Sequence, residues 1–389
     1  TCNEMSSTYG VSLLAGRICT RCLKLNPSAY YHASRIIAAQ LSPAVVRQKK
    51  IIGQIRRSNL LKDDKYDCEE SLPPLHLLNA AYESGALNIN PEKALDFLRL
   101  YKNLGGSSQR LEQKLCREQN ITTGTVTLLA LILRRCKTKA QQSLARSLIL
   151  SASAMGDRTA TFEIISSALR TNSLHHYHVV LTQLEDLAND GDQQAMMLLG
   201  KVLFYTNSEK RSLSWLQKAT HPTTGNLDFE GASESLVLEG RILQKQSDLS
   251  GAKSAFEKAA KQLNDPQAYF YLSKMEVNGT PLQVDYLLKA ASAGVTEAWY
   301  NLGVIELDEI QKNGIQPKKL EDYGLAREWF LVAAHDGHGP SMLNLAIMSK
   351  MSQNLNQAFE WLKKAESIPN VSIESEKLRQ EWTSATSQA

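Results

Sequence analysis

The sequence has little cysteine, glycine or proline and no long apolar run. Its six cysteines, at positions 2, 19, 22, 68, 116 and 136 of 389 residues, are too sparse for a disulfide-stapled module, so reduced thiols are expected. The longest apolar candidate, residues 125–133, is far shorter than the roughly 18 residues that a membrane-spanning helix needs. With 21 glycines, 11 prolines and 43% apolar residues, the composition excludes collagen and disordered polymers and is typical of a globular chain.

The chain has no large excess of positive or negative charge overall, but its charged residues are unevenly distributed. The chain carries 44 basic and 40 acidic residues, which give a formal charge of +4. Residues 1–62 hold ten of the basic residues and only one acid, Glu4, so the other 327 residues keep 34 basic and 39 acidic groups. A basic leader nearly free of acids and rich in Arg, Ser and Ala is typical of a mitochondrial transit segment. The alternative is a basic arm that contacts RNA or an anionic lipid surface.

Motifs that would indicate enzyme chemistry are missing. The sequence contains no Gly-rich phosphate loop, no GxSxG and no HExxH. The pair Cys19 and Cys22 lacks the second pair, or the two histidines, of a zinc site. The histidines from His175 to His178 are expected to be exposed or capping residues at a repeat junction, and His335 and His338 are expected in a solvated turn. We therefore expect no catalytic, cofactor-binding or metal-binding residues.

A short apolar signature recurs through the second half of the chain. A pair that contains an aromatic residue or leucine, here called the large pair, is followed one turn later by alanine. The copies are Trp215-Leu216 with Ala219, Ala255-Phe256 with Ala259, Tyr286-Leu287 with Ala290, Trp329-Phe330 with Ala333, and Trp361-Leu362 with Ala365. Such self-similarity is the signature of a repeat protein.

Each copy is followed by a helix stop, then a small residue, then a leucine with a small neighbour. The stops are Gly156, Gly191, Gly231 (a weak match), Asn264, Gly294 and Gly337, spaced by 35, 40, 33, 30 and 43 residues. The leucine pairs are Leu199-Gly200, Leu272-Ser273, Leu302-Gly303 and Leu345-Ala346. Gly and Asn tolerate the left-handed conformation that ends a helix.

These patterns predict helical hairpins. Helix A of each unit carries the leucine pair, helix B carries the large pair, and small residues let the two backbones approach. Because one hairpin cannot cover its own apolar stripe, the hairpins must stack. The predicted fold is all-α, a right-handed α-solenoid of antiparallel hairpins. We expect the large aromatics Trp215, Phe256, Trp329 and Trp361 to form the core between the helices rather than a ligand-binding stack.

Two stretches carry a family resemblance. The phrases Ala290-Ala291-Ser-Ala-Gly294-Val-Thr-Glu-Ala298-Trp-Tyr-Asn-Leu302-Gly303 and Ala326-Arg-Glu-Trp329-Phe330-Leu-Val-Ala333-Ala334-His-Asp-Gly337 resemble Sel1-like repeats, close relatives of tetratricopeptide (TPR) repeats. Together with the basic leader, the same run is similar to a fungal TPR-type factor for export and assembly of cytochrome c oxidase subunit II. That resemblance implies a matrix protein held peripherally on the inner membrane.

The resemblance and the helical patterns together predict four segments. Residues 1–62 form the targeting leader, 63–137 an N-terminal helical section, 138–367 the repeats, and 368–389 a capping helix and tail that frays after Thr383. In the second segment we expect helices over 75–83, 92–102, 109–119 and 125–135.

The surface of the A helices is the candidate partner site, because a stack leaves it free. One residue after the leucine pair stand Lys201, Arg241 and Lys274, then Val304 and Ile347. The same face carries Gln194, Met197, Gln267, Phe270, Glu297 and Tyr300. We expect the face to bind a peptide or helix with an acidic or carboxylate feature. The alternative is that these are ordinary solvated positions.

Three functions are consistent with these patterns. The first is a non-enzymatic mitochondrial scaffold that binds a protein partner at the inner membrane. The second is an RNA-binding repeat protein, although the variable spacing and the net acidic body count against nucleic acid. The third is a Sel1-type adaptor in endoplasmic-reticulum quality control or signalling, for which a secretory signal is expected.

Overall fold

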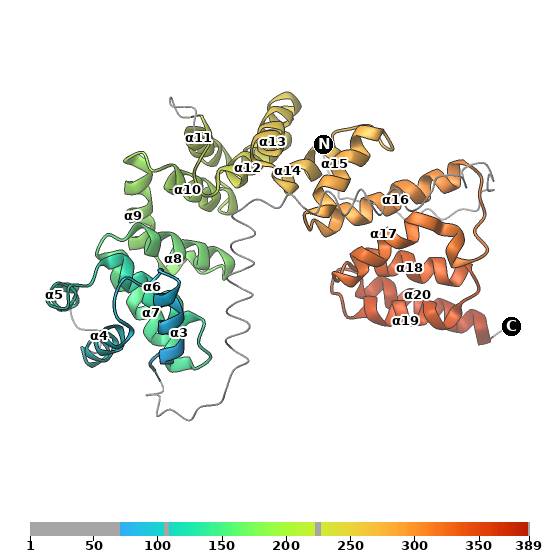
Figure 1. Ribbon diagram of the computed structural model, residues 1–389. Helices are drawn as coiled ribbons and strands as arrows, with labels where there is room; N and C mark the ends of the chain where they lie inside the picture. Colours follow the sequence, from blue (N-terminus) through green and yellow to red (C-terminus); the bar gives the residue numbers. More distant parts are fainter. Residues whose placement is uncertain (1–70, 105–108, 222–226, 388–389) are drawn as a thin grey trace. The chain divides into compact units, whose positions relative to one another are not determined.

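The computed structural model describes residues 71–104, 109–221 and 227–387, and every regular element in these ranges is helical (Figure 1). The predicted leader and the Cys19–Cys22 pair lie outside them. The described chain divides into two compact units, one ending at Asp248 and the other beginning at Leu249. We call them the N-terminal and C-terminal units. The boundary falls inside the segment predicted as repeats, where the sequence shows no linker.

The N-terminal unit holds helices α3 to α12. Their bounds are α3 Leu75–Glu83, α4 Pro91–Asn103, α5 Gln109–Glu118, α6 Thr123–Arg134, α7 Lys139–Ala154, α8 Arg158–Arg170, the 3₁₀ turn η1 Leu174–His176, α9 His178–Asn189, α10 Gln193–Tyr205, α11 Glu209–Thr220 and α12 Ala232–Lys245. The helices predicted over 75–83, 92–102, 109–119 and 125–135 are confirmed to within two residues at each end.

The C-terminal unit holds helices α13 to α20. Their bounds are α13 Leu249–Leu263, α14 Pro266–Ser273, α15 Pro281–Ser292, α16 Thr296–Lys312, the 3₁₀ turn η2 Leu320–Tyr323, α17 Gly324–His335, α18 Gly339–Met351, α19 Leu355–Glu366 and α20 Ser372–Ser387. Between the repeat stops Gly294 and Gly337, which are 43 residues apart, α16 runs to Lys312 and η2 precedes α17.

The predicted hairpins are confirmed. Within the units α6 packs on α7, α10 on α11, α14 on α15, α16 on α17 and α18 on α19, and the A helices α8, α10 and α12 also pack side by side. The small residue of the leucine pair is what lets A and B approach. A methyl group added at Gly200 would lie 2.7 Å from Leu216 Cδ2 on α11. The all-α class is therefore confirmed, while the handedness of the superhelix stays a prediction.

The turns between repeats behave as predicted. Gly156, Gly191, Gly294 and Gly337 have φ between 86° and 100°, and Asn264 has φ 52°. A left-handed residue there ends one helix, and an aspartate often starts the next: Asp157, Asp192 and Asp265 each accept a hydrogen bond from a backbone N–H of the first turn. Ser247 and Gln353 are also left-handed, in A-to-B turns that the pattern did not mark.

The prediction for the large aromatics needs a correction. Phe256 and Trp361 are buried, but Trp215 and Trp329 are only half-buried. The next residue in these copies, Leu216 and Phe330, is fully buried instead. The first large residue lies at the edge of the hairpin: the Lys218 ammonium stands 4.3 Å from the Trp215 ring centroid, and Trp329 stacks on Trp299 with centroids 5.0 Å apart.

The two ends of the described chain are held by different means. Tyr101 on α4 bonds to Glu112 on α5 at 3.3 Å and to Ser147 on α7 at 3.2 Å, so three helices share one buried polar contact. At the other end α20 packs on α19, and Trp382 of α20 and Val371, the residue before this helix, are both buried. The expected terminal helix is present as α20 and continues to Ser387, and fraying after Thr383 stays a prediction.

Candidate partner-binding surface

The predicted surface position is at least partly accessible in every repeat compared. The leucine pairs of α10, α12, α14, α16 and α18 are buried, counting Glu239-Gly240 as the pair of α12, whereas the next residue is half-buried or exposed. These next residues are Lys201, Arg241, Lys274, Val304 and Ile347. Each A helix therefore presents one side chain at an equivalent place, three of them cationic and two apolar.

The three cations have different surroundings. The Lys201 ammonium lies 2.6 Å from the carboxylate of Glu234 on α12, and only 25% of its side chain is exposed. The Arg241 guanidinium lies over the Phe204 ring, 5.0 Å from the centroid. Lys274 is exposed, with its ammonium 4.2 Å from the Phe270 centroid. Lys201 is thus compensated by an anion of its own chain. Moreover, Lys274 belongs to the C-terminal unit and the other two to the N-terminal unit.

Two residues predicted to line the surface are buried instead. Met197 and Phe270 are each 7% exposed. Met197 packs directly against Gly231, the residue that begins α12, and Phe270 belongs to the core cluster around Leu287 and Leu302. Both supply packing between neighbouring helices, so the prediction that they offer contact area to a partner is wrong.

The polar residues on this face divide into a bonded and an exposed group. Gln194 accepts a hydrogen bond from Arg158 at 3.0 Å and donates one to Glu230 at 3.2 Å. It therefore links α8, α10 and the segment before α12. Gln267 and Glu297 are exposed.

Tyr300 is half-buried between α16 and α18. Its ring lies 5.7 Å from that of Phe330 and 4.8 Å from that of His338, and its hydroxyl shares a hydrogen bond with Asn344. Burial raises the pKa of Tyr300 above its ordinary value. The hydroxyl therefore stays protonated over the physiological range.

The histidines have two different roles. His175, His176 and His178 are exposed beside η1, as predicted. His338 was also expected in a solvated turn, which is wrong: it is half-buried and caps α18, with Nδ1 accepting from the Ser341 N–H at 3.3 Å. Burial lowers its pKa. Among the described residues, no group of three His, Cys, Asp or Glu side chains is placed to hold a metal ion.

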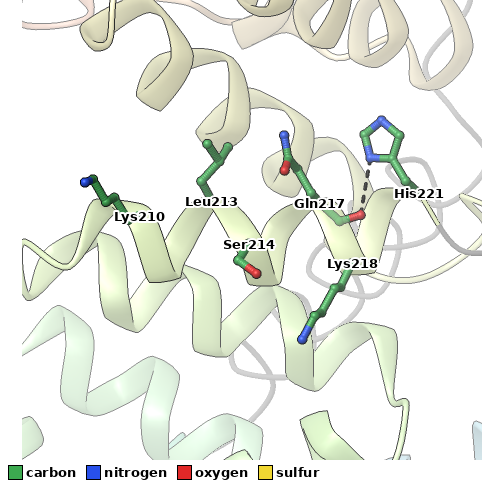
Figure 2. A pocket seen from close by; sticks show the side chains of 6 residues that line it. All are labelled: Lys210, Leu213, Ser214, Gln217, Lys218 and His221. Carbon is green, nitrogen blue, oxygen red and sulfur yellow. Dashed lines mark hydrogen bonds between the residues drawn. The ribbon is translucent and has the colours of Figure 1, made fainter.

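An open pocket of about 430 Å³ on α11 was not predicted from the sequence. Figure 2 shows the side chains that line it on one face of this helix: Lys210, Leu213, Ser214, Gln217, Lys218 and His221. Beneath them Glu239 of α12, 4% exposed, accepts hydrogen bonds from Gln217 at 3.3 Å and from Thr220 at 3.2 Å. The repeat pattern marks only the buried side of helix B, so it carried no signal for this outer face.

The comparisons with known proteins concern the fold. No family model and no curated protein matches the sequence. Among solved structures, a Sel1 repeat protein from Oxalobacter formigenes is 19% identical, with TM-score 0.48, over 82% of this chain and 96% of that one. The protective antigen c5321 of uropathogenic Escherichia coli, which displays an SLR fold, is 18% identical, with TM-score 0.44, over 75% and 68%.

Yeast Tom70 is a third similar structure, 11% identical, with TM-score 0.48, over 93% of this chain and 79% of Tom70. Two of these three structures are described as Sel1-repeat or SLR-fold proteins. The likeness concerns architecture, which the chain's own paired helices establish. No helix in the described ranges is long and apolar enough to cross a membrane.

Proposed function

We propose that the chain is a non-enzymatic scaffold that binds a protein partner on the surface of its A helices. The observation that carries this proposal is the residue after the leucine pair, which remains accessible in five A helices while the pair itself is buried. Within one unit, a surface built from one side chain per repeat suits an extended or helical segment, because such a segment offers its own side chains at regular intervals.

The C-terminal unit offers the more open part of this surface. Lys274, Gln267 and Glu297 are exposed, and Val304 and Ile347 are half-buried apolar neighbours. In the N-terminal unit, only 25% of the Lys201 side chain is exposed, and Gln194 is half-buried. A partner with an apolar face and an acidic group would contact Val304 and Ile347 with the first and Lys274 with the second.

Charge reversal tests the surface. Lys274→Glu should weaken capture of the protein partner by the full chain at least about tenfold, because a charge-assisted contact becomes repulsive. Lys363→Glu is the matched control, since Lys363 is exposed on helix B α19 of the same unit. Equal capture by both variants and the unaltered chain, all with unchanged circular dichroism, would remove the A-helix surface from the proposal.

We further propose that the protein works in mitochondria, in the matrix or on the matrix face of the inner membrane. The support is the charge of residues 1–62, with ten basic residues and one acid. The likeness to the fungal TPR-type factor makes biogenesis of cytochrome c oxidase subunit II the specific role proposed. A fluorescent fusion of residues 1–62 should enter mitochondria, whereas a reticular signal would favour the endoplasmic-reticulum adaptor.

RNA binding is the competing role, and salt dependence separates it from protein binding. Contacts to phosphate weaken steeply with salt because bound counterions are released. We expect the full chain to show no salt-sensitive retention of a random RNA pool. Retention that falls steeply between about 50 and 200 mM salt would favour the RNA-binding alternative.

A further inference from the structure

A cleft in the N-terminal unit lies away from the α10 and α12 surface positions described above. It has a volume of about 250 Å³ and opens between α6, α7 and α8 and the turn before α9. It is lined by Arg134, Gln142, Arg146, Ile149, Leu150, Glu163, Ile164, Ser167 and Tyr177. It is the size of one large amino-acid side chain rather than of a folded partner.

The turn from α8 to α9 borders the cleft. It takes residues 171–177 and includes η1, whereas the A-to-B turns after α10 and α18 occupy only residues 206–208 and 352–354. The turns after α14 and α16, residues 274–280 and 313–323, are also long. Tyr177, the last residue of the α8–α9 turn, lines the cleft together with side chains of α6, α7 and α8.

The floor of the cleft is apolar. Ile149 and Ile164 are each 5% exposed, and Leu150 is half-buried beside them. Tyr177, also half-buried, adds an aromatic wall. An apolar body placed here would be favoured because it removes its own surface and that of these side chains from water.

The rim carries an excess of positive charge. Arg134 Nη1 lies 3.0 Å from Glu163 Oε2, so these two charges offset one another. Arg146 is exposed, and within the described chain its side chain has no hydrogen bond or ion pair. The three ionised groups therefore leave one guanidinium whose charge the cleft itself does not balance. Guanidinium groups match carboxylates in charge and in planar geometry.

We propose that this cleft binds an apolar carboxylate, with the hydrophobic body on Ile149, Ile164 and Tyr177 and the acid group on Arg146. The hydrophobic body would then contact the apolar side chains and the carboxylate would contact the guanidinium, which line the same cleft. Gln142 and Ser167 on the rim can bond a neighbouring amide. This site does not depend on the A-helix surface, and neither proposal requires the other.

The first test uses a small probe on the full chain. N-acetyl-phenylalanine has an aromatic body and a free carboxylate, and N-acetyl-phenylalaninamide is its neutral counterpart. With the isoleucine δ1 methyl groups labelled for NMR, the acid should shift the signals of Ile149 and Ile164 saturably. The amide should bind about tenfold more weakly, since it lacks the charge. Absent shifts, or equal affinities for acid and amide, would overturn the proposal.

Variants locate the charge that matters. Arg146→Gln should reduce affinity for the acid about tenfold and leave affinity for the amide unchanged, and Arg146→Lys should restore part of the loss. Arg135→Gln is the matched control, because Arg135 is exposed nearby and does not line the cleft. If Arg146→Gln and Arg135→Gln bind the acid equally well while the methyl spectrum stays native, Arg146 is not the carboxylate site.

A third arm separates two sources of the acid. The peptide Ala-Ala-Ala-Ala-Phe with a free carboxyl end should bind at least as tightly as N-acetyl-phenylalanine if the natural ligand is the end of a protein chain. Weaker binding of this peptide would indicate a small free acid. Either result keeps the site, and the failure of both acids removes it.

Discussion

Gly303 on α16 faces the ring of Phe330 on α17, and a methyl group added at Gly303 would lie 2.7 Å from the ring carbon Cε1. Phe330 is fully buried, so it has no free space into which it can move. The same relationship joins Gly200 to Leu216 in the N-terminal unit. The small residue of the leucine pair therefore sets the distance between helices A and B.

Gly303→Ala should consequently destabilise the protein even though alanine is the better helix former. Overpacking a rigid contact costs about 1–3 kcal/mol, which exceeds the gain of about 1 kcal/mol in helix propensity. Gly124→Ala is the control, because nothing lies within 4 Å of a methyl group there. Urea unfolding should show a lower midpoint for the first variant and an equal or higher one for the second. A Gly303→Ala protein as stable as the unaltered chain would show that the contact is not tight.

Gln353→Gly should stabilise the C-terminal unit. Gln353 has φ 61° in the turn between α18 and α19. A residue with a side chain in the left-handed conformation costs about 1–2 kcal/mol of stability, which glycine avoids. Glycine also has more conformational freedom in the unfolded chain, which lowers the stability of the folded state by about 0.4–1 kcal/mol. We expect a net gain of about 0.5–1 kcal/mol in thermal or urea unfolding.

The opposite substitution, from glycine to alanine, can be made at a repeat stop. Gly294→Ala forces a side chain into φ 100° and should lower the unfolding midpoint, although nothing lies within 4 Å of the added methyl group. If both variants were neutral, left-handed geometry would not limit the stability of these turns.

Protonation of His338 should weaken the start of α18. Its Nδ1 accepts the Ser341 N–H only while the nitrogen is unprotonated, and burial lowers the pKa of His338 although Glu297 opposes this. The unfolded chain then binds the proton more readily than the folded one. The contribution of His338 is therefore complete above the unfolded pKa of about 6.5 and is lost as the pH falls below it toward the lower folded pKa.

His338→Asn keeps a capping oxygen without a titrating group. Its stability should fall less between pH 7 and pH 5 than that of the unaltered chain, in circular dichroism melts at each pH. His335→Asn is the control, since His335 is exposed. If His338→Asn and the unaltered chain lose the same stability over this range, the cap does not sense pH.

Glu306 occupies a slot that other repeats fill with leucine. It stands three residues after Gly303, as Leu203 does after Gly200 and Leu243 after Gly240. Burial, and to a lesser extent the nearby Glu309, raises the pKa of Glu306. Glu306→Leu should therefore raise stability by about 1 kcal/mol or more at pH 7.

The gain in stability from Glu306→Leu should become smaller as the pH falls. A carboxyl with a raised folded pKa is stabilised, relative to the unfolded chain, as the pH falls toward its unfolded pKa of about 4.3. Melts of both proteins at pH 7 and pH 4.5 test this. A gain that is equal or larger at pH 4.5 would show that the benefit of leucine does not come from removing a buried charge.

Most of the fold could be predicted from the sequence because the same packing pattern recurs in several repeats. The stops at Gly156 and Gly294 and the pairs Leu199-Gly200 and Leu302-Gly303 each have a single physical interpretation, and all four lie where it requires. The break between Asp248 and Leu249 was missed, because no glycine- or proline-rich linker marks it.

The site was less predictable because its properties depend on contacts between repeats. Position along helix A showed that Lys201 would be near the surface, but not that Glu234 of the next helix A would neutralise it. It placed Met197 on the same face, but not under Gly231. The cleft beside Tyr177 is lined by side chains of α6, α7, α8 and the turn before α9, a combination that the pattern along one helix does not indicate.

Photo-crosslinking tests the central claim most directly. A benzophenone side chain would replace Val304 on helix A α16 in one full-length protein and the exposed Glu360 on helix B α19 in another. Both would be irradiated in the cells that make the protein. We predict a discrete protein adduct from position 304 that Lys274→Glu diminishes, and none from position 360. Adducts of equal yield from both positions, or only from position 360, would contradict partner binding on the A helices.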